Sequence, residues 1–581
     1  MGIYENNSYL YNLKSYSIRY KMSYKQGENR TQINLYPICL EEGIAEDNVV
    51  RVIDAFVNWL DLEKLGFQNS SDKLLGTSMY APGVLLKLYL YGYLNRIRSS
   101  RRLELECTRN IELHWLLNRL TPGYHTIADF RKNNSVPLQG VFKEFTQFCI
   151  ALSLIEGEEV AFDGTKIHAQ NNPKNNFNAA RLEKLLHRIE NKTAQYEQYL
   201  KELDEQDQLQ SKDYVPYGKN KIDIENTLKL LAERKTKYEG YQKELKTLAE
   251  NGCSTEDLQI STVDPDARSM VFKNNNTAIG YNVQTVGDAK HSLIVHYEVS
   301  NIGDRNALSA LAIETKAILG LSEEETYNAL ADSGYHTGSE FAQCAENGII
   351  TYVCPIGISN TIPKTAKISS KEKKATYTKD QFIYDATTDT YTCPNKQKLT
   401  SNGNWYTRKP SVKRRFEQKY KEYTLACSTC KSCPFSVECQ GNRVKWSHGK
   451  CISRTEYDDA IEANQERIVS TPSYYQRRKE IIEHPFGTIK RSWGYYYTLV
   501  RTKKKVGGEF ALIYLCYNLR RVLTVLGANG LKNALKGHFL HFLNFCKALS
   551  YFFVFLYQNS LKKYHLAQPF SSYFKLFLIS F

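Results

Sequence analysis

Three carboxylates of this chain stand at positions from which they could converge on one metal site. Asp163 follows a short strand-like run at 160–162, Asp332 follows a later one, and Glu483 lies in a helical pattern further along the chain. In open α/β sheets, ligands gather beyond the carboxyl ends of strands, so distant acids can meet there. Carboxylates suit Mg²⁺, which keeps positions for water and phosphate. Two such ions could activate a nucleophile and stabilise the leaving oxygen of a phosphodiester.

Other residues compete for this role. Asp264 and Asp266 come before a strand-like run, which puts them at the wrong end of it, whereas Asp304 follows such a run and is the reserve candidate. His336 comes four residues after Asp332 and could help to place water or a substrate, or could simply cap or pack.

The segment around Glu483, YYQRRKEIIEHPFGTIKRSWGY, is rich in basic and aromatic residues. Glu483 and Lys490 are seven residues apart, two helical turns, which predicts that they share one face. Pro485 predicts a kink just after the acid. An aromatic ring such as that of Trp493 can stack on an extruded base, although a core tryptophan is the more common role. The residues expected to contact DNA phosphates or bases are Tyr475, Arg477, Arg478, Lys479, Lys490, Arg491 and Trp493.

Fourteen cysteines are present, and most are scattered singly through apolar segments, as is typical of reduced thiols. One group differs, with the spacing C-x2-C-x2-C-x5-C, and fits a tetrahedral Zn²⁺ site. A metal-free knot and an iron–sulfur cluster are the alternatives. The possible ligands are Cys393, Cys427, Cys430, Cys433 and Cys439.

The periodicity along the chain predicts several kinds of structure. Residues 45–150 carry helical apolar patterns, and two long helical patterns between 179 and 250 predict an antiparallel hairpin. Strand-like runs alternate with helical patterns from about 280 to 355, as in an α/β layout. A polar, cysteine-bearing stretch follows at 360–450, and helices return at 473–494 and 508–527.

Length and composition bound the possibilities. The chain has 581 residues, 42% of them hydrophobic, so it should fold into about three or four units. Its net charge of +15 favours a polyanionic partner, either nucleic acid or a membrane surface. The N-terminus has no apolar signal-peptide core, which predicts a cytoplasmic protein. An apolar stretch near residues 538–558 carries polar residues every third position, which favours a partner-facing helix over a membrane span.

Three motifs taken together resemble the DDE transposases of bacterial insertion sequences: VAFDGTKIHA, NALADSGYHTGSEF and the segment around Glu483. The resemblance covers about residues 30–527. It departs from the family at one point, because Lys479 stands one turn before Glu483 where many relatives have arginine. The resemblance implies that Asp163, Asp332 and Glu483 are the catalytic, Mg²⁺-binding acids, with two ions per site, and that the cysteines stabilise a β-rich insertion.

The implied fold is an α/β RNase H-like catalytic core, a mixed sheet with flanking helices, interrupted by a helical hairpin and a cysteine-rich insertion and preceded by an all-α domain. The expected boundaries are an N-terminal extension at 1–44, a helical DNA-binding domain at 45–150, the catalytic domain at 151–527 with insertions at 175–255 and 360–455, and an apolar helical tail at 528–581.

The resemblance implies a cytoplasmic bacterial transposase that cleaves double-stranded DNA at the terminal inverted repeats of its insertion sequence and transfers the strands, acting as a homodimer without a membrane. Two alternatives stay open. One is a metal-dependent nuclease without strand transfer, and the other is a catalytically silent DNA-binding protein derived from a transposase.

Overall fold

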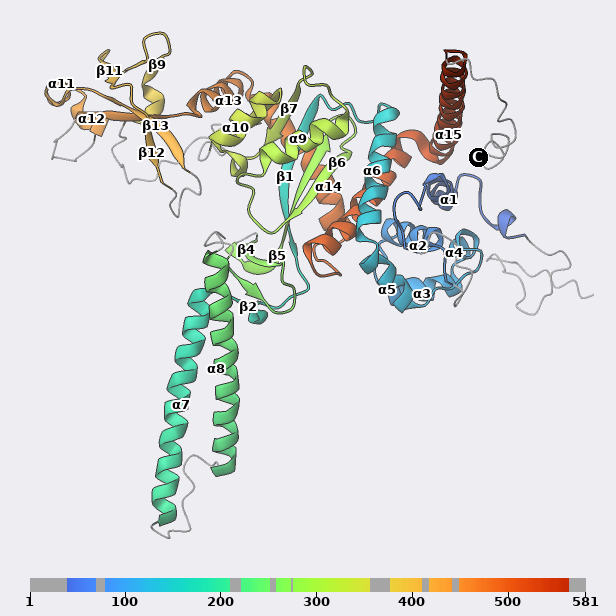
Figure 1. Ribbon diagram of the computed structural model, residues 1–581, viewed down its shortest axis with the longest axis horizontal. Helices are drawn as coiled ribbons and strands as arrows, with labels where there is room; N and C mark the ends of the chain where they lie inside the picture. The colour runs from blue at the N-terminus through green and yellow to red at the C-terminus, as the bar shows by residue number, and fades with distance from the viewer. Residues whose placement is uncertain are drawn as a thin grey trace, which may run out of the picture. The chain divides into compact units, whose positions relative to one another are not determined.

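The computed structural model describes residues 39–68, 79–208, 221–250, 258–272, 275–355, 377–409, 417–440 and 449–563, and after residue 537 only the backbone (Figure 1). The chain divides into two compact units, Met1–Ala45 and Glu46–Phe581. In the first unit the described part holds one 3-10 turn, Leu40–Gly43. All contacts below belong to the second unit.

The second unit begins with six helices. Local signals explain where two of them start: the Asn48 side chain accepts a hydrogen bond from the Val50 backbone N–H at the start of α1, and Pro82 occupies the first turn of α2. No strand interrupts the described residues from 46 to 151, as the helical patterns predict. The helices are α1 (Val49–Trp59), α2 (Pro82–Leu94), α3 (Ser100–Arg109), α4 (Ile111–Leu116), α5 (Tyr124–Asn133) and α6 (Ser135–Ala151).

A buried ion pair ties these helices to the C-terminal helix α15 (Lys503–Lys563). Arg98 lies 2.7 Å from Glu509, and both side chains are almost fully buried. Glu509 also accepts a hydrogen bond from the Leu499 N–H. Arg98 follows an apolar helix in a run of arginines and could therefore have met phosphates, but its guanidinium serves this internal pair.

The central sheet has six strands, β1 (Glu159–His168), β4 (Arg268–Val271), β5 (Thr277–Asp288), β6 (Ile294–Ser300), β7 (Tyr327–Ala331) and β8 (Ile349–Val353). Its order is β4-β5-β1-β7-β8, with β6 also pairing with β5. β1 pairs antiparallel with β5 and parallel with β7, and β7 pairs parallel with β8. β1 is longer than predicted: it continues through Asp163 to His168, because β5 pairs with it along that whole length.

Helices flank the sheet, and two asparagines close its edges. Asn464 of α13 bonds both the N–H and the C=O of Val353 on β8, at 2.9 and 2.7 Å. Asn518 of α15 does the same for Ile294 on β6, at 2.8 and 2.7 Å. The flanking helices are α9 (Leu308–Leu319), α10 (Gly338–Glu346), α13 (Asp458–Ser470), α14 (Pro472–Phe486) and α15.

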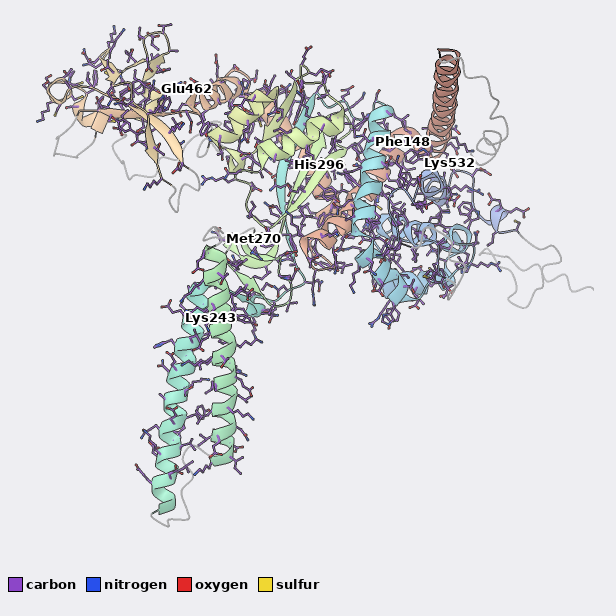
Figure 2. All side chains as sticks on the ribbon, in the orientation of Figure 1. Phe148, Lys243, Met270, His296, Glu462 and Lys532 are labelled. Carbon is purple, nitrogen blue, oxygen red and sulfur yellow. The ribbon has the colours of Figure 1, made fainter. Side chains whose placement is uncertain are left out.

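The predicted hairpin consists of α7 (Ala179–Gln208) and α8 (Lys221–Glu250), which lie side by side (Figure 1). The two-stranded pair β2 (Asn176–Phe177) and β3 (Ile260–Ser261) closes its base. There Phe177, Leu182 and Leu245 form a small core. Along the hairpin most side chains project into solvent, as Lys243 does in Figure 2.

The cysteine-bearing stretch folds around a second sheet. Its core includes Tyr391, Leu399 and Tyr423. Arg454 of β14 donates two hydrogen bonds to Glu462 of α13, labelled in Figure 2, which ties this sheet to the helix that leads back to the core. The elements are β9 (Ile383–Asp385), β10 (Thr390–Thr392), β11 (Lys398–Ser401), β12 (Tyr406–Arg408), β13 (Gln418–Thr424), β14 (Cys451–Thr455), α11 (Cys427–Lys431) and α12 (Ser436–Gln440).

Helix α15 is interrupted once, at Gly527, whose φ is +70°. Within the described residues, the segment Lys503–Gly537 is long and apolar enough to span a membrane, but 61% of its most apolar stretch is buried. That burial is the mark of a core helix. The apolar tail predicted from residue 528 continues the helix to Lys563, and its final residues lie outside the described part.

Candidate active site

The strand register places Asp163 and Asp332 side by side. The last parallel pair between β1 and β7 joins Phe162 to Ala331. Asp163 and Asp332 are the next residues on their respective strands, so both leave the ladder at the same level. Asp332 then caps a 3-10 turn, accepting a hydrogen bond from the Gly334 N–H at 2.7 Å. Two of the three predicted acids therefore meet at the carboxyl end of the parallel pair.

A third carboxylate, Asp304, joins them from the loop after β6. Its Oδ1 accepts hydrogen bonds from Asn282 and Gln284 of β5, each at 2.8 Å. The Gln284 Oε1 in turn accepts a hydrogen bond from the Tyr335 hydroxyl, in the turn that Asp332 caps. The reserve candidate of the sequence is thus held by β5, close enough for its charge to raise the pKa of Asp163.

Glycine at position 164 is what makes this approach possible. A Cβ on Gly164 would lie 2.0 Å from Asp304 Oδ1 and 2.9 Å from Asn282 Oδ1. No real Cβ comes so close to an oxygen, so a larger residue at position 164 would have to displace the Asp304 carboxylate. The Asp-Gly pair does not mark a strand end, as the sequence suggested, but leaves room within the strand for another acid.

The electrostatics of the site reflect this crowding. Burial raises the pKa of Asp163 to about 7; the Arg478 guanidinium opposes the rise, and the charges of Asp332 and Asp304 add to it. Arg478 lies 3.3 Å from Asp163 and is itself buried. Carboxylates that repel one another in a buried site are stabilised by a bound cation. Arg478, which the sequence assigned to DNA phosphates, pairs with Asp163 in this structure.

Glu483 is placed differently. It is exposed on α14, five residues and 140° around the helix from the Arg478 face that meets Asp163. The strongest charges acting on Asp163 are Arg478, Asp332 and Asp304. The described structure therefore does not bring Glu483 to the two strand acids, and its assignment as the third acid stays a prediction.

The helix changes its geometry shortly after Glu483. Pro485 lies inside α14, which runs to Phe486 and then changes into a π-helical turn at Gly487–Ser492. A π turn takes more residues than an α turn, so the simple rule that residues seven apart share a face fails across it. The expected common face of Glu483 and Lys490 therefore stays a prediction.

The other predicted DNA contacts fall into two groups. Lys479 and Arg491 are exposed, and Arg477 is half exposed while it pairs with Glu159 at 2.7 Å. Tyr475 is half-buried, and Lys490 donates to the Lys166 C=O of β1 at 2.8 Å. Trp493 is a correction: it is 5% exposed and packs edge-on against Tyr495, so it is a core residue rather than a platform for a base.

The remaining acids have structural partners. The Asp264 carboxylate accepts hydrogen bonds from the Tyr281 hydroxyl and the Thr502 N–H, and Asp266 accepts one from the Lys503 N–H. The His336 ring packs against Phe341, and burial lowers its pKa. These contacts match the packing alternatives.

The sequence analysis did not identify the two β5 residues that donate hydrogen bonds to Asp304. Asn282 and Gln284 are nearly fully buried in an otherwise apolar strand, two residues apart and so on one face. A buried amide needs a partner, and two on one face point to a polar site. That spacing, in YNVQTV, was the available signal.

The donor set at the acids suits a hard cation, because it consists of carboxylate and amide oxygens. Among the described residues, however, no three His, Cys, Asp or Glu side chains are arranged around a single point as metal ligands. The chemistry of the residues thus fits Mg²⁺, and their side chains would have to turn toward it.

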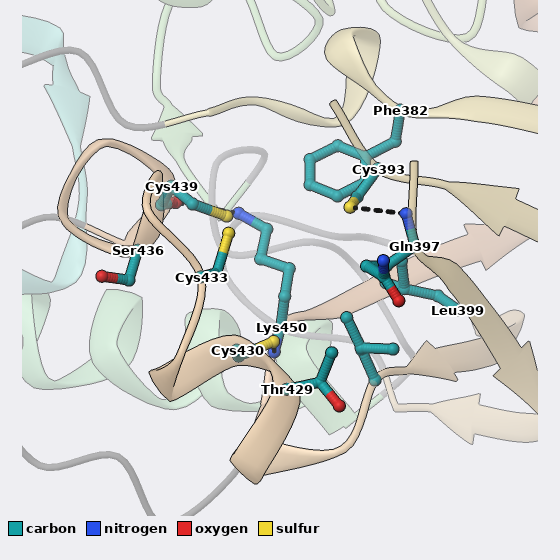
Figure 3. Close-up of a pocket in the computed structure, with 11 residues that line it drawn as sticks. Phe382, Cys393, Gln397, Leu399, Thr429, Cys430, Cys433, Ser436, Cys439 and Lys450 are labelled. Carbon is teal, nitrogen blue, oxygen red and sulfur yellow. Dashed lines mark hydrogen bonds between the residues drawn. The ribbon is translucent and has the colours of Figure 1, made fainter. Parts of the chain in front are cut away.

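The cysteines gather elsewhere. Four of the five predicted ligands line one pocket, drawn in Figure 3, and they come from β10–β11 and the two short helices. Three of the sulfurs accept hydrogen bonds from nitrogen: Cys393 from the Gln397 N–H at 3.3 Å, Cys430 from the Lys450 N–H at 3.3 Å and Cys433 from Asn395 at 3.4 Å. Cys427 begins α11 and is not among the lining residues. The pocket is lined by Cys393, Cys430, Cys433 and Cys439 together with Lys450 and apolar neighbours.

Comparison with known families finds two transposase domains in this chain. Residues 38–133 match the transposase domain DUF772, and residues 392–523 match the transposase DDE domain. The chain is a DDE-type transposase. The second match includes α14 and Glu483, while β1 and β7, with Asp163 and Asp332, lie before it.

No curated protein matches the transposase. Among solved structures, it is similar to the piggyBac transposase synaptic complex with hairpin DNA, determined by cryo-electron microscopy, at 10% identity and a TM-score of 0.28. The similarity covers 84% of this chain and 77% of the other. A likeness at that level carries no argument about this fold, so the family rests on the two domain matches.

Proposed function

We propose that this transposase cleaves DNA at the terminal inverted repeats of its own insertion sequence and transfers the strands with Mg²⁺, as a homodimer in the bacterial cytoplasm. The observation that supports the proposal is the register of β1 and β7, in which Asp163 and Asp332 follow the last pair together. The raised pKa of Asp163 is the electrostatic sign of a site that needs a cation.

The core is proposed to be RNase H-like. In support, the central strand β1 has antiparallel neighbours β5 and β6 on one side and parallel neighbours β7 and β8 on the other. The acids stand at the carboxyl end of the parallel pair, where open α/β sheets collect ligands.

Asp163 and Asp332 are the residues proposed to hold the metal, and Glu483 is proposed to join them as the third acid when DNA is bound. A bound Mg²⁺ would activate the attacking oxygen and stabilise the leaving one. Arg478, which pairs with Asp163, orients that carboxylate and opposes the rise of its pKa. The exposed Lys479 and Arg491 are free to approach DNA phosphates.

Strand transfer is what separates this proposal from a simple nuclease. The test incubates purified protein and Mg²⁺ with labelled DNA that carries the repeats flanking the gene, plus a target plasmid. Joined products from the parent protein, and none from Asp163→Asn, support the proposal. Cutting without joining would favour the nuclease, and end binding without cutting would favour the silent DNA-binding protein.

The cysteine pocket is proposed to hold a structural Zn²⁺. The nitrogen donors that approach three of its sulfurs stabilise thiolates better than thiols, and thiolates are what Zn²⁺ binds. Purified protein should contain about one zinc per chain. Cys430→Ser should lower both zinc content and thermal stability, whereas Cys516→Ser, in the core far along the chain, should leave zinc unchanged. A stable protein without zinc would contradict the proposal.

A further inference from the structure

Helix α3 carries an exposed face that is basic and contains no carboxylate. Successive residues of an α-helix are about 100° apart, so the exposed residues of α3 fall within a sector of about 120°. That sector holds three arginines, a threonine and a leucine, and the leucine, at its centre, is 51% exposed. The exposed residues are Arg101, Arg102, Leu105, Thr108 and Arg109.

The two glutamates of α3 lie outside this face. Glu106 is buried and pairs with Arg109. Glu104 is half-buried, and its Oε1 lies 3.7 Å from the Cβ position of a glycine at the start of α5. Among the described residues, no carboxylate forms an ion pair with Arg101 or Arg102, and Arg101 lies over the ring of Tyr124 at 5.0 Å. The face therefore carries positive charge that the protein does not neutralise, which favours a polyanion.

The packing beneath α3 holds this face outward. Helix α2 precedes α3, and the turn between them spans 95–99, with Arg96 at a φ of +62°. A Cβ on Gly92 of α2 would lie 2.6 Å from Leu103 Cδ2, so the two helices are in close contact there. Arg98, in the same turn, is buried against α15. Two helices joined by a short turn, the second with an exposed polar face, are the arrangement by which helix-turn-helix proteins enter the major groove.

Basic residues continue from α3 toward the catalytic core. The Arg96 guanidinium donates a hydrogen bond to Ser492 Oγ at 3.5 Å. Ser492 follows Arg491, which is exposed in the π turn after α14. The arginines of α3, of the turn before it and of the segment after α14 therefore lie on adjoining elements. A duplex bound on α3 would meet further cations at the end of α14, and each could neutralise a phosphate.

We propose that α3 reads the terminal repeats, lying in the major groove of duplex DNA with Arg102 and Leu105 against the base edges. This rests on the proposed function, since the repeats are its substrate. An arginine donates two hydrogen bonds to guanine O6 and N7, and an apolar side chain contacts the methyl group of thymine. Arg101 and Arg109, which have partners within the protein, contact the phosphates on either side.

The experiment compares the affinity of the full chain for duplex DNA carrying the repeats and for a shuffled duplex of equal length and composition. Fluorescence anisotropy at fixed salt and without Mg²⁺ measures binding and prevents cleavage. Leu105→Ala should lower the preference for the repeats about tenfold, a usual loss for one base contact, with little change on the shuffled duplex. Arg102→Lys, which keeps the charge but not the planar fork, should lower the preference as well. Both positions are exposed and both replacements are good helix formers, so the variants should fold.

Two further measurements separate base reading from charge. Arg234→Ala is the matched control, because Arg234 is an exposed arginine of α8, and this variant should keep the preference of the parent protein. Dimethyl sulfate methylates guanine N7 in the major groove. Guanines of the repeat that the parent protects from this reagent should become reactive when Arg102→Ala is bound.

Two results would overturn the inference. One is an unaltered preference in both Leu105→Ala and Arg102→Lys. The other is an equal loss of affinity for the repeat and shuffled duplexes, which would make α3 a phosphate-binding helix only. Strand joining by the parent would leave the proposed function standing in either case. If instead the parent joined no strands while the α3 variants lost the preference, the reading of the repeats by α3 would stand and the proposed function would fail.

Discussion

The β1–β7 pair and helix α14 position acidic residues by different means. In the parallel pair, the hydrogen-bond ladder fixes which residues are neighbours, and Asp163 and Asp332 follow the last pair together. On α14, position depends on how the helix is rotated against the sheet, and Arg478 rather than Glu483 faces Asp163. A ladder thus sets a site rigidly, whereas a helix that turns, or changes from α to π geometry, can bring different residues to it.

Removing Asp163 or Asp332, the two acids that the β1–β7 pairing positions, should have the largest effect. We expect Asp163→Asn or Asp332→Asn to lower the cleavage rate at least about a thousandfold, the upper range for losing one electrostatic contributor at an active site. Binding to the DNA ends should persist, because phosphate contacts are made elsewhere. Single-turnover cleavage and gel-shift assays on the same preparations would check this. Mg²⁺-dependent cutting at the parent rate would remove the residue from the site.

The helix is tested by two variants of its basic segment. Glu483→Gln should lower cleavage about a hundredfold, and more than Lys490→Ala, because an amide is a far weaker Mg²⁺ ligand than a carboxylate. Lys490→Ala should weaken DNA binding and reduce its salt slope by about one. Rates and affinities measured across a salt series would separate the two effects. If Glu483→Gln cleaved like the parent, Glu483 would not be the third acid, and Glu480, on the same helix, would become the better candidate.

A substitution at Gly164 tests how tightly Asp304 packs against β1. Gly164→Ala places a methyl group 2.0 Å from Asp304 Oδ1, and overpacking of this kind costs about 1–3 kcal/mol. We expect lower stability toward urea and weaker cleavage. Gly303→Ala is the matched control, since a Cβ there meets nothing within 4 Å although it adjoins Asp304. Equal stability of the two variants would mean that Asp304 moves aside freely.

A smaller effect should come from pH. Because burial raises the pKa of Asp163 to about 7, the ionised fraction falls about tenfold for each unit below that value. Cleavage should rise with pH up to about 7 and then level off. The folded state holds this proton more tightly than the unfolded state, where the pKa is about 3.9, so the stabilisation is full below pH 4 and lost as the pH rises through 7. Thermal unfolding of the parent and Asp163→Asn across pH 4–8 would show whether this dependence disappears in the variant.

Most of the secondary structure could be predicted from the sequence because it depends on local patterns of apolar and polar residues. Helical periodicity marked α7 and α8, and alternating strand and helix signals marked the α/β core. Asp163 and Asp332 could be found because each follows a short apolar run. The coarse transposase assignment needed only motifs in the right order.

What could not be predicted depends on contacts between distant segments. Nothing near Arg478 shows that Asp163, 315 residues earlier in the chain, is its partner. Trp493 is buried by packing with Tyr495, although it stands in a basic segment that suggested DNA, and Arg98 is buried by its pair with Glu509. The π turn at 487–492 shifts a helical register that spacing alone sets at 100° per residue.

The two asparagines at the borders of the central sheet limit how two copies of the chain can meet. Proteins often associate by adding a strand to a free sheet edge, which uses unpaired backbone groups. At Val353 and Ile294 those groups are already occupied by Asn464 and Asn518. At these places, a dimer that held two DNA ends would therefore have to form through side chains or through the DNA itself. Replacing either asparagine by leucine would leave the backbone groups of that strand unpaired and prone to aggregation.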